Sequence, residues 1–133
     1  MPHLTLDYSG NLRDTGRMDV LCASLARELV AFEADGQRVY PVGGVRVRAI
    51  AADHWCIGDG RADAAYVHAR LSMAAGRSAA TTKATGDALF GVMKAHFADQ
   101  FARQGLALSL EIAEFGEDGT WKHNNLHARM RGP

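Results

Sequence analysis

The chain has 133 residues, of which 47% are hydrophobic and 23% are charged, as is typical of a soluble globular domain. A chain of this length buries roughly two-thirds of the surface that its unfolded form exposes, so it needs no disulfide or metal to fold. Its 15 Lys and Arg residues equal its 15 Asp and Glu residues, which excludes the basic charge of a general nucleic-acid binder. We expect one domain, 1–133, that binds no nucleic acid.

The sequence also predicts a cytoplasmic protein. The first nine residues alternate polar and apolar side chains, unlike a signal peptide. Charged residues interrupt every apolar stretch before the ~18 residues that a membrane-spanning helix needs. Cys22 and Cys56 show no CxxC spacing, which fits a reducing compartment, and we expect both to be small core residues.

The first half of the chain predicts a strand, a helix and a second strand. His3–Tyr8 alternates polar and apolar residues and ends at a turn-forming cluster. Apolar residues recur at helical spacing over Asp19–Phe32, with Gly36 as the expected stop. Val45–Ile50 alternates again, with Arg46 and Arg48 on one face.

A loop over 53–63 leads into the same pattern in the second half. Ala65–Met73 is strand-like, and Ser78 is the candidate cap of a helix that runs to about Phe101. Leu106–Phe115 alternates with period two, which predicts a fourth strand, and residues 116–133 are expected to form a loop.

These elements predict an α/β (α+β) fold of two repeated βαβ units, over about 1–53 and 64–115, with a tail at 116–133. The strands within each unit should be parallel, and both helices should cover one face of a four-stranded sheet. We expect many apolar positions on the opposite face, and therefore an oligomer that buries it.

Pro2 is the first candidate for chemistry. Removal of Met1 would leave a secondary amine at the start of a strand, and burial beside cations would lower its pKa toward neutrality. Such an amine is a general base at neutral pH. While Met1 is retained, the nitrogen of Pro2 is an amide and is not basic.

Arg46 and Arg77 are the candidate anion-binding residues. Arg46 follows Gly43-Gly44-Val45 on a predicted strand, and Arg77 lies between a strand and a helix N-terminus. An arginine binds a carboxylate through two parallel hydrogen bonds, and a helix N-terminus adds a favourable dipole. Arg48 either shares the role of Arg46 or pairs with a nearby acid.

Other chemistries lack support in the sequence. His123 and His127 are four residues apart, but the tail shows no helical period and no third ligand at a recognisable spacing, so we expect no metal and no cofactor. Dinucleotide, phosphate-loop and nucleophile-elbow motifs are missing from the sequence. The strand carboxylates are interpreted as exposed or interface groups rather than as an acid–base pair: Asp7, Glu111 and Glu114.

Taken together, the motifs of this chain resemble the 5-carboxymethyl-2-hydroxymuconate isomerase family of the tautomerase superfamily over nearly its whole length. Their order and spacing carry the resemblance more than any single motif. They are Met1-Pro2-His3, Asn11-Leu12-Arg13, Gly44-Val45-Arg46-Val47-Arg48, Asp53 with Trp55, Tyr66-Val67-His68, Ala75-Gly76-Arg77-Ser78, Leu108-Ser109-Leu110-Glu111-Ile112 and Asn124-Asn125-Leu126-His127.

The resemblance implies a tautomerase fold, a homotrimer and a cofactor-independent isomerase that acts on an unsaturated carboxylate. It places the catalytic base at Pro2 and the substrate-binding arginines at Arg46 and Arg77, and it suggests homoprotocatechuate degradation as the pathway. The stretch Leu29–Val42 is longer than in the family, and the tail differs around Trp121 and His123. Decarboxylation or hydration of an unsaturated acid, and a non-catalytic trimeric binding module, remain the alternatives.

Overall fold

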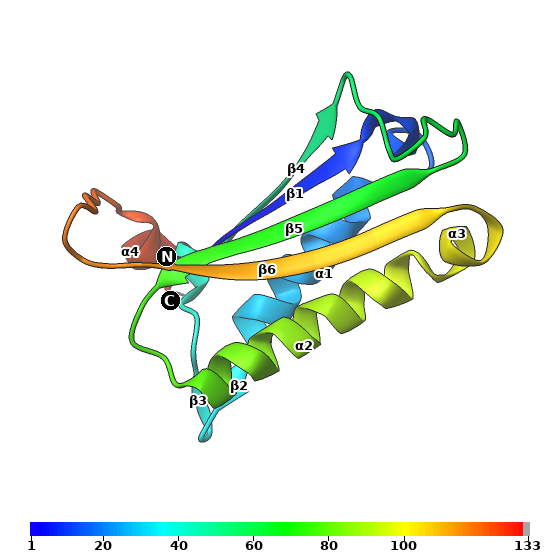
Figure 1. The fold of residues 1–133 in the computed structure, drawn as a ribbon. Helices are drawn as coiled ribbons and strands as arrows, with labels where there is room; N and C mark the ends of the chain where they lie inside the picture. Colours follow the sequence, from blue (N-terminus) through cyan, green and yellow to red (C-terminus); the bar gives the residue numbers. More distant parts are fainter. Residues whose placement is uncertain (132–133) are drawn as a thin grey trace.

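The computed structural model describes residues 1–131, and it has the predicted order of strands and helices (Figure 1). Residues 132 and 133 of the predicted tail lie outside the described residues. The strands are β1 (His3–Ser9), β2 (Glu33–Ala34), β3 (Gln37–Arg38), β4 (Arg46–Ala52), β5 (Ala65–Ala74) and β6 (Leu106–Phe115). The helices are α1 (Met18–Ala31), α2 (Ala79–His96), α3 (Ala98–Arg103) and α4 (Leu126–Met130), with 3-10 turns η1 (Gly10–Leu12) and η2 (Val42–Gly44).

The main sheet has four strands in the order β4-β1-β5-β6. As predicted, β1 and β4 are parallel, and so are β5 and β6, while β1 and β5 pair antiparallel at the centre. Helices α1 and α2 both lie on one face of this sheet (Figure 1). The core between them is built from alternate strand residues such as Leu4, Leu6 and Leu71, and from Leu21 and Leu89 of the helices.

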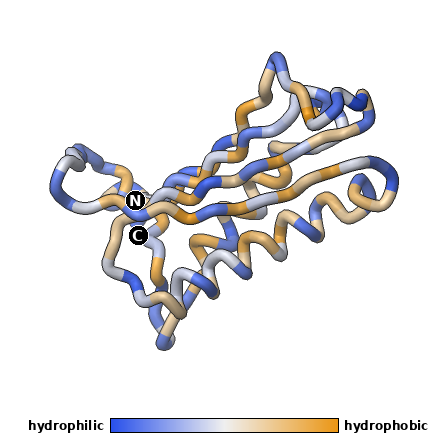
Figure 2. The backbone as a smooth tube through the Cα atoms, in the orientation of Figure 1, coloured by the Kyte–Doolittle hydropathy of each residue, from blue (hydrophilic) through white to orange (hydrophobic). Residues whose placement is uncertain are grey.

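The opposite face of the sheet is mainly polar, which corrects the expectation of many apolar positions there. Alternation along each strand puts every second side chain on this face, and Figure 2 shows hydrophilic residues recurring along the strands. Its polar members are His3, Thr5, Asp7, Arg46, Arg48, His68, Arg70, Ser72, Ser109 and Glu111. Burial of apolar surface on this face therefore gives no argument for an oligomer.

The segment between α1 and β4 contains a small hairpin that the sequence analysis did not predict. Helix α1 ends at Ala31, and Gly36 is not its stop but part of the turn between β2 and β3. Asp35 and Gly36 both have positive φ, at 54° and 75°. Asp-Gly with two positive φ angles is the usual two-residue connection of a β-hairpin, so local turn chemistry explains the difference.

The second predicted helix is divided in two. Ser78 caps α2 as expected, because its hydroxyl accepts a hydrogen bond from the Thr81 N–H at 3.1 Å. The helix then breaks at Phe97, which is fully buried and whose N–H still bonds the Met93 carbonyl at 3.1 Å. The break turns α3 toward the start of β6 while the Phe97 ring stays in the core.

Two further expectations need correction. Cys56 is exposed and Cys22 only partly buried, so Cys56 is not a core residue. The tail is not wholly a loop, because α4 forms within it. Within residues 1–131, none of the helices combines the length and the apolar character that crossing a membrane requires.

Candidate functional site

Pro2 is buried immediately before β1, where the pairing of two strands holds it in place. The Arg46 N–H donates to the Pro2 carbonyl at 3.1 Å, and His3 pairs with Arg46 in the parallel register of β1 and β4. The backbone of Pro2 is thus fixed by the sheet.

Arg46 brings a partly buried guanidinium to the start of the chain. Its Nη1 lies 3.1 Å from the Gly44 carbonyl and 3.5 Å from the Gly43 carbonyl, so η2 anchors the side chain. The same nitrogen lies 3.4 Å from Sδ of Met1. A charged donor is therefore held beside the first residue of the chain, in the position predicted for a substrate-binding arginine.

Arg48 lies two residues further along β4 and faces the same side of the sheet. Its Nη1 is 3.4 Å from Nδ1 of His3. Burial and the charges of Arg48 and Arg46 lower the pKa of His3. Arg48 therefore contacts His3 and not an acid. His3 is the residue that follows Pro2 in the chain.

Arg77 approaches from the loop between β5 and α2 and is held in two ways. Its Nη1 donates to the Ala74 carbonyl at 2.8 Å, and its guanidinium carbon lies 4.7 Å from the centroid of the Tyr40 ring. Tyr40 is fully buried, and its hydroxyl lies 2.8 Å from Oγ1 of Thr85. The ring is a fixed platform that restricts where the guanidinium can point.

The amine at the chain start lies in a positively charged environment. The pKa of the Met1 ammonium is lowered from 8.0, first by burial and then by the charges of Lys122, Arg77 and Arg46. Arg46 contacts the first residue, and the charges of Arg77 and of Lys122, a residue not predicted from the sequence, also act on the amine.

The C-terminal tail reaches the same place. Nδ2 of Asn124 lies 3.3 Å from Sδ of Met1. A Cβ on Gly43 would come within 2.7 Å of the His127 backbone nitrogen, so this close packing of α4 on η2 requires a glycine. The Asn-Asn pair was visible in the sequence, but no local pattern indicated that residues more than a hundred positions apart would meet.

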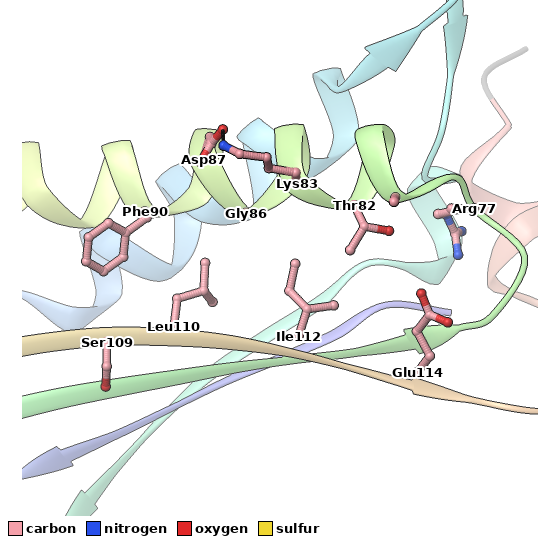
Figure 3. A pocket seen from close by; sticks show the side chains of 11 residues that line it. Arg77, Thr82, Lys83, Gly86, Asp87, Phe90, Ser109, Leu110, Ile112 and Glu114 are labelled. Atoms are coloured by element: carbon pink, nitrogen blue, oxygen red, sulfur yellow. Dashed lines mark hydrogen bonds and ion pairs between the residues drawn. The ribbon is translucent and has the colours of Figure 1, made fainter.

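A large groove lies elsewhere on the molecule. A groove of about 900 Å³ runs between α2 and β6, with Arg77 at one end (Figure 3). We call it the α2–β6 groove; its lining includes Arg77, Thr82, Gly86, Phe90, Leu110 and Ile112. It shares only Arg77 with the chain start, and the one ion pair among its lining side chains is Lys83 with Asp87, within α2. The groove is a mainly apolar surface beside an edge strand, which favours protein contact over catalysis.

Other motif residues stabilise the opposite end of β1. Arg13 forms an ion pair with Asp53, and the Asn11 side chain donates to the Ala64 carbonyl at 2.8 Å. These contacts tie η1 to the loop between β4 and β5. They are structural, and they lie far from Pro2 along the strand.

Acidic and histidine side chains do not form a second site. Asp7 accepts a hydrogen bond from the Tyr66 hydroxyl at 3.0 Å, and Oε1 of Glu111 lies 3.3 Å from Nε2 of His68. Both carboxylates, and Glu114, are exposed, as the sequence suggested. In the part of the chain that the structure describes, no cluster of three or more His, Cys, Asp or Glu could hold a metal ion.

Comparison with known proteins identifies the family of this chain. The family model for 5-carboxymethyl-2-hydroxymuconate isomerase matches residues 2–130. The chain belongs to this isomerase family. It is 36% identical over 131 residues to the 5-carboxymethyl-2-hydroxymuconate Delta-isomerase of Escherichia coli, covering 98% of this chain and 100% of that protein. The predicted family resemblance is confirmed.

Solved structures place this isomerase family member in the expected fold. The 5-carboxymethyl-2-hydroxymuconate isomerase of Deinococcus radiodurans R1 is 48% identical and superposes with a TM-score of 0.88, covering 98% of this chain and 95% of that one. A macrophage migration inhibitory factor-like protein of Entamoeba histolytica has a TM-score of 0.58 at 9% identity, over 92% and 96% of the two chains. That likeness shows the fold alone, and the predicted tautomerase fold is confirmed.

Proposed function

We propose that this isomerase converts 5-carboxymethyl-2-hydroxymuconate to its keto isomer, with the amine of Pro2 as general base. The observation that carries the proposal is the chain start itself, where Pro2 is buried and held by strand pairing and Arg46 contacts the residue before it. Burial and the charges of Lys122, Arg77 and Arg46 lower the pKa of the Met1 amine, and we expect the same surroundings to lower the pKa of the Pro2 amine. A base with a pKa near the working pH both accepts and returns a proton efficiently. The amine takes a proton from the substrate and delivers it to a carbon further along the conjugated chain.

The proposal requires removal of Met1. With Met1 in place, the nitrogen of Pro2 belongs to a peptide bond, and Sδ of Met1 lies 3.4 Å from Nη1 of Arg46. Removal of the residue creates the secondary amine and takes away the sulfur that Nη1 of Arg46 contacts, while the hydrogen bond of that nitrogen to the Gly44 carbonyl remains. The buried position and sheet pairing of Pro2 keep the new terminus in place.

Arg46 and Arg77 bind the carboxylates of the substrate in this proposal. Both are partly buried and anchored to backbone carbonyls, at 3.1 Å and 2.8 Å, so little conformational entropy is lost when an anion binds. Negative charge that builds on the dienolate during proton transfer is stabilised by the same guanidinium groups. No cofactor is part of the proposed reaction.

The test begins with protein whose loss of Met1 is verified by intact mass. We expect it to accelerate the ultraviolet change of 5-carboxymethyl-2-hydroxymuconate above the buffer rate. Pro2→Ala should keep the fold and lower kcat by about 10²-fold or more, the usual contribution of a positioned base. Arg77→Ala should mainly raise KM, while Arg61→Ala, an exposed arginine paired with Asp59, should change neither constant.

Two results would contradict the proposal. A processed wild-type protein that does not accelerate the reaction above the buffer rate would refute the substrate assignment. Undiminished turnover by Pro2→Ala would refute the amine as the base.

We also propose that the 133 residues form one domain and that three copies assemble into a homotrimer. The two βαβ units share one continuous sheet, which supports a single domain. The α2–β6 groove and the unpaired edge of β6 offer an apolar surface that a second copy would cover. Light scattering on the eluted protein tests the trimer, and a monomeric mass would refute it.

The proposed compartment is the cytoplasm. Cys22 and Cys56 are both free thiols, and Cys56 is exposed, which fits a reducing environment. Cell fractionation tests this, and recovery of the protein outside the cytoplasmic fraction would contradict it.

A further inference from the structure

Two hydrogen-bond donors from distant parts of the chain converge on one atom at the chain start. Nη1 of Arg46 lies 3.4 Å from Sδ of Met1, and Nδ2 of Asn124 lies 3.3 Å from the same sulfur. A thioether is a weak acceptor, so neither donor is well satisfied by this contact. An oxygen of a bound anion would be a much better partner for both.

The orientation of the Asn124 side-chain amide is fixed by the hydrogen bond that its oxygen accepts. Oδ1 accepts a hydrogen bond from the Leu126 N–H at 2.6 Å, just before α4 begins. A backbone N–H can donate only to the oxygen of the amide, so this hydrogen bond assigns Oδ1 and Nδ2 of Asn124. The amide nitrogen therefore faces the chain start as a donor.

The position of this donor depends on close packing of the tail. Gly43 leaves room for the backbone of Leu126 and His127, which a Cβ would meet at 2.9 Å and 2.7 Å. Gly43 and Gly44 also provide the carbonyls that hold Arg46. The turn η2 thus fixes both donors, Arg46 through hydrogen bonds and Asn124 through the packing of α4.

We propose that Asn124 is a substrate-binding residue that, once Met1 is removed, donates a hydrogen bond to a carboxylate oxygen held together with Arg46. The inference rests on the proposed function for the location of the substrate. It adds a neutral donor to a site whose other ligands are cations. A neutral donor directs the carboxylate without adding positive charge beside the amine.

Asn124→Asp is the sharpest test, because it changes one end of the side chain only. A carboxylate keeps an oxygen that accepts from the Leu126 N–H, while the donor facing the chain start becomes a negatively charged acceptor. Asn125→Asp is the matched control, since it adds the same charge one residue further along. Asn125 is exposed, and its side chain makes no capping hydrogen bond.

The first readout is binding of cis,cis-muconate, measured by calorimetry on protein without Met1. This dicarboxylate has the conjugated chain of the proposed substrate but lacks the 2-hydroxyl group, so it does not undergo the keto–enol reaction. Loss of a hydrogen bond to a charged group should weaken binding by about 10-fold or more in Asn124→Asp. We expect Asn125→Asp to stay within about 2-fold of wild type, as surface charges contribute little.

The outcomes separate this inference from the proposed function. Equal muconate affinities for the two variants, or no binding by the wild type, would overturn the role of Asn124. A second outcome is that Asn124→Asp selectively weakens muconate binding while the wild type does not accelerate the reaction of 5-carboxymethyl-2-hydroxymuconate. This outcome would support the role of Asn124 and refute the proposed substrate. Melting curves of the two variants that coincide would show that the effect is not a loss of fold.

Discussion

Tyr40 offers a way to separate the stability of the fold from the positioning of Arg77. The ring is fully buried, and its centroid lies 4.7 Å from the Arg77 guanidinium carbon. Its hydroxyl lies 2.8 Å from Oγ1 of Thr85, which also donates to the Thr81 carbonyl at 2.9 Å. Tyr40→Phe removes the hydroxyl and keeps the ring, whereas Tyr40→Leu removes the ring as well.

The two substitutions should differ in size and in kind. In Tyr40→Phe, Thr85 keeps its bond to the helix backbone, so the cost is one net hydrogen bond, about 0.5–1.5 kcal/mol of unfolding free energy. Tyr40→Leu adds a cavity in the core, for a total of about 2–4 kcal/mol. Only Tyr40→Leu also removes a cation–π contact to a partly buried arginine, about 1 kcal/mol or about 5-fold in substrate affinity.

Urea unfolding and steady-state kinetics measure these effects separately. We expect both variants to unfold at lower urea, Tyr40→Leu more so, while KM rises only in Tyr40→Leu. Equal KM values for the two variants would refute the argument that the aromatic ring positions Arg77. A KM increase in Tyr40→Phe would instead indicate that the hydroxyl matters for substrate binding.

Two other substitutions test the chain start. Burial is the largest cause of the lowered pKa of the Met1 amine, and Lys122 contributes most among the neighbouring charges. We expect the same charge to act on the Pro2 amine of the processed enzyme, so Lys122→Gln should raise the pKa of that amine. The neutral amine is the base, so the acidic limb of the kcat/KM profile should move to higher pH with an unchanged alkaline plateau; superimposable profiles would contradict this. Gly43→Ala should displace α4 and raise KM, because the new Cβ would meet the backbone of Leu126 and His127. Gly91→Ala is the control, since a Cβ there meets open space, and it should leave KM unchanged. Equal KM values for the two variants would disprove the packing argument.

The sequence predicted the main sheet because alternation is a direct consequence of strand geometry. Leu4 and Leu6 alternate with polar residues along β1, and both are fully buried on the face that α1 and α2 cover. Helical spacing likewise predicted the first helix over Asp19–Phe32, and leucines of that segment such as Leu21 and Leu25 are fully buried. Element boundaries that depend on turn chemistry, such as the Asp35-Gly36 hairpin, were not recognised.

The site was only partly predictable, for a different physical reason. Pro2, Arg46 and Arg77 drew attention because their residue types suit proton transfer and anion binding. Asn124 was part of a recognised motif but had no predicted role, and its contact with the chain start accompanies the packing of α4 against η2. Lys122 was not singled out in the sequence, although its charge acts on the amine at the chain start. A contact across more than a hundred residues leaves no periodic pattern in the chain.

The placement of cations also explains how one amine can serve as base and then as acid in the proposed reaction. The chain as a whole carries no formal net charge, yet the positive charges of Arg46, Arg77 and Lys122 all lower the pKa of the amine at the chain start. In the proposed reaction these positive charges favour the neutral form of the Pro2 amine, which is the form that accepts a proton. Carboxylates bound at Arg46 and Arg77 in the proposed complex offset part of this positive charge, which favours the protonated amine once the substrate is present. The charges that bind the substrate thus make proton uptake depend on substrate binding.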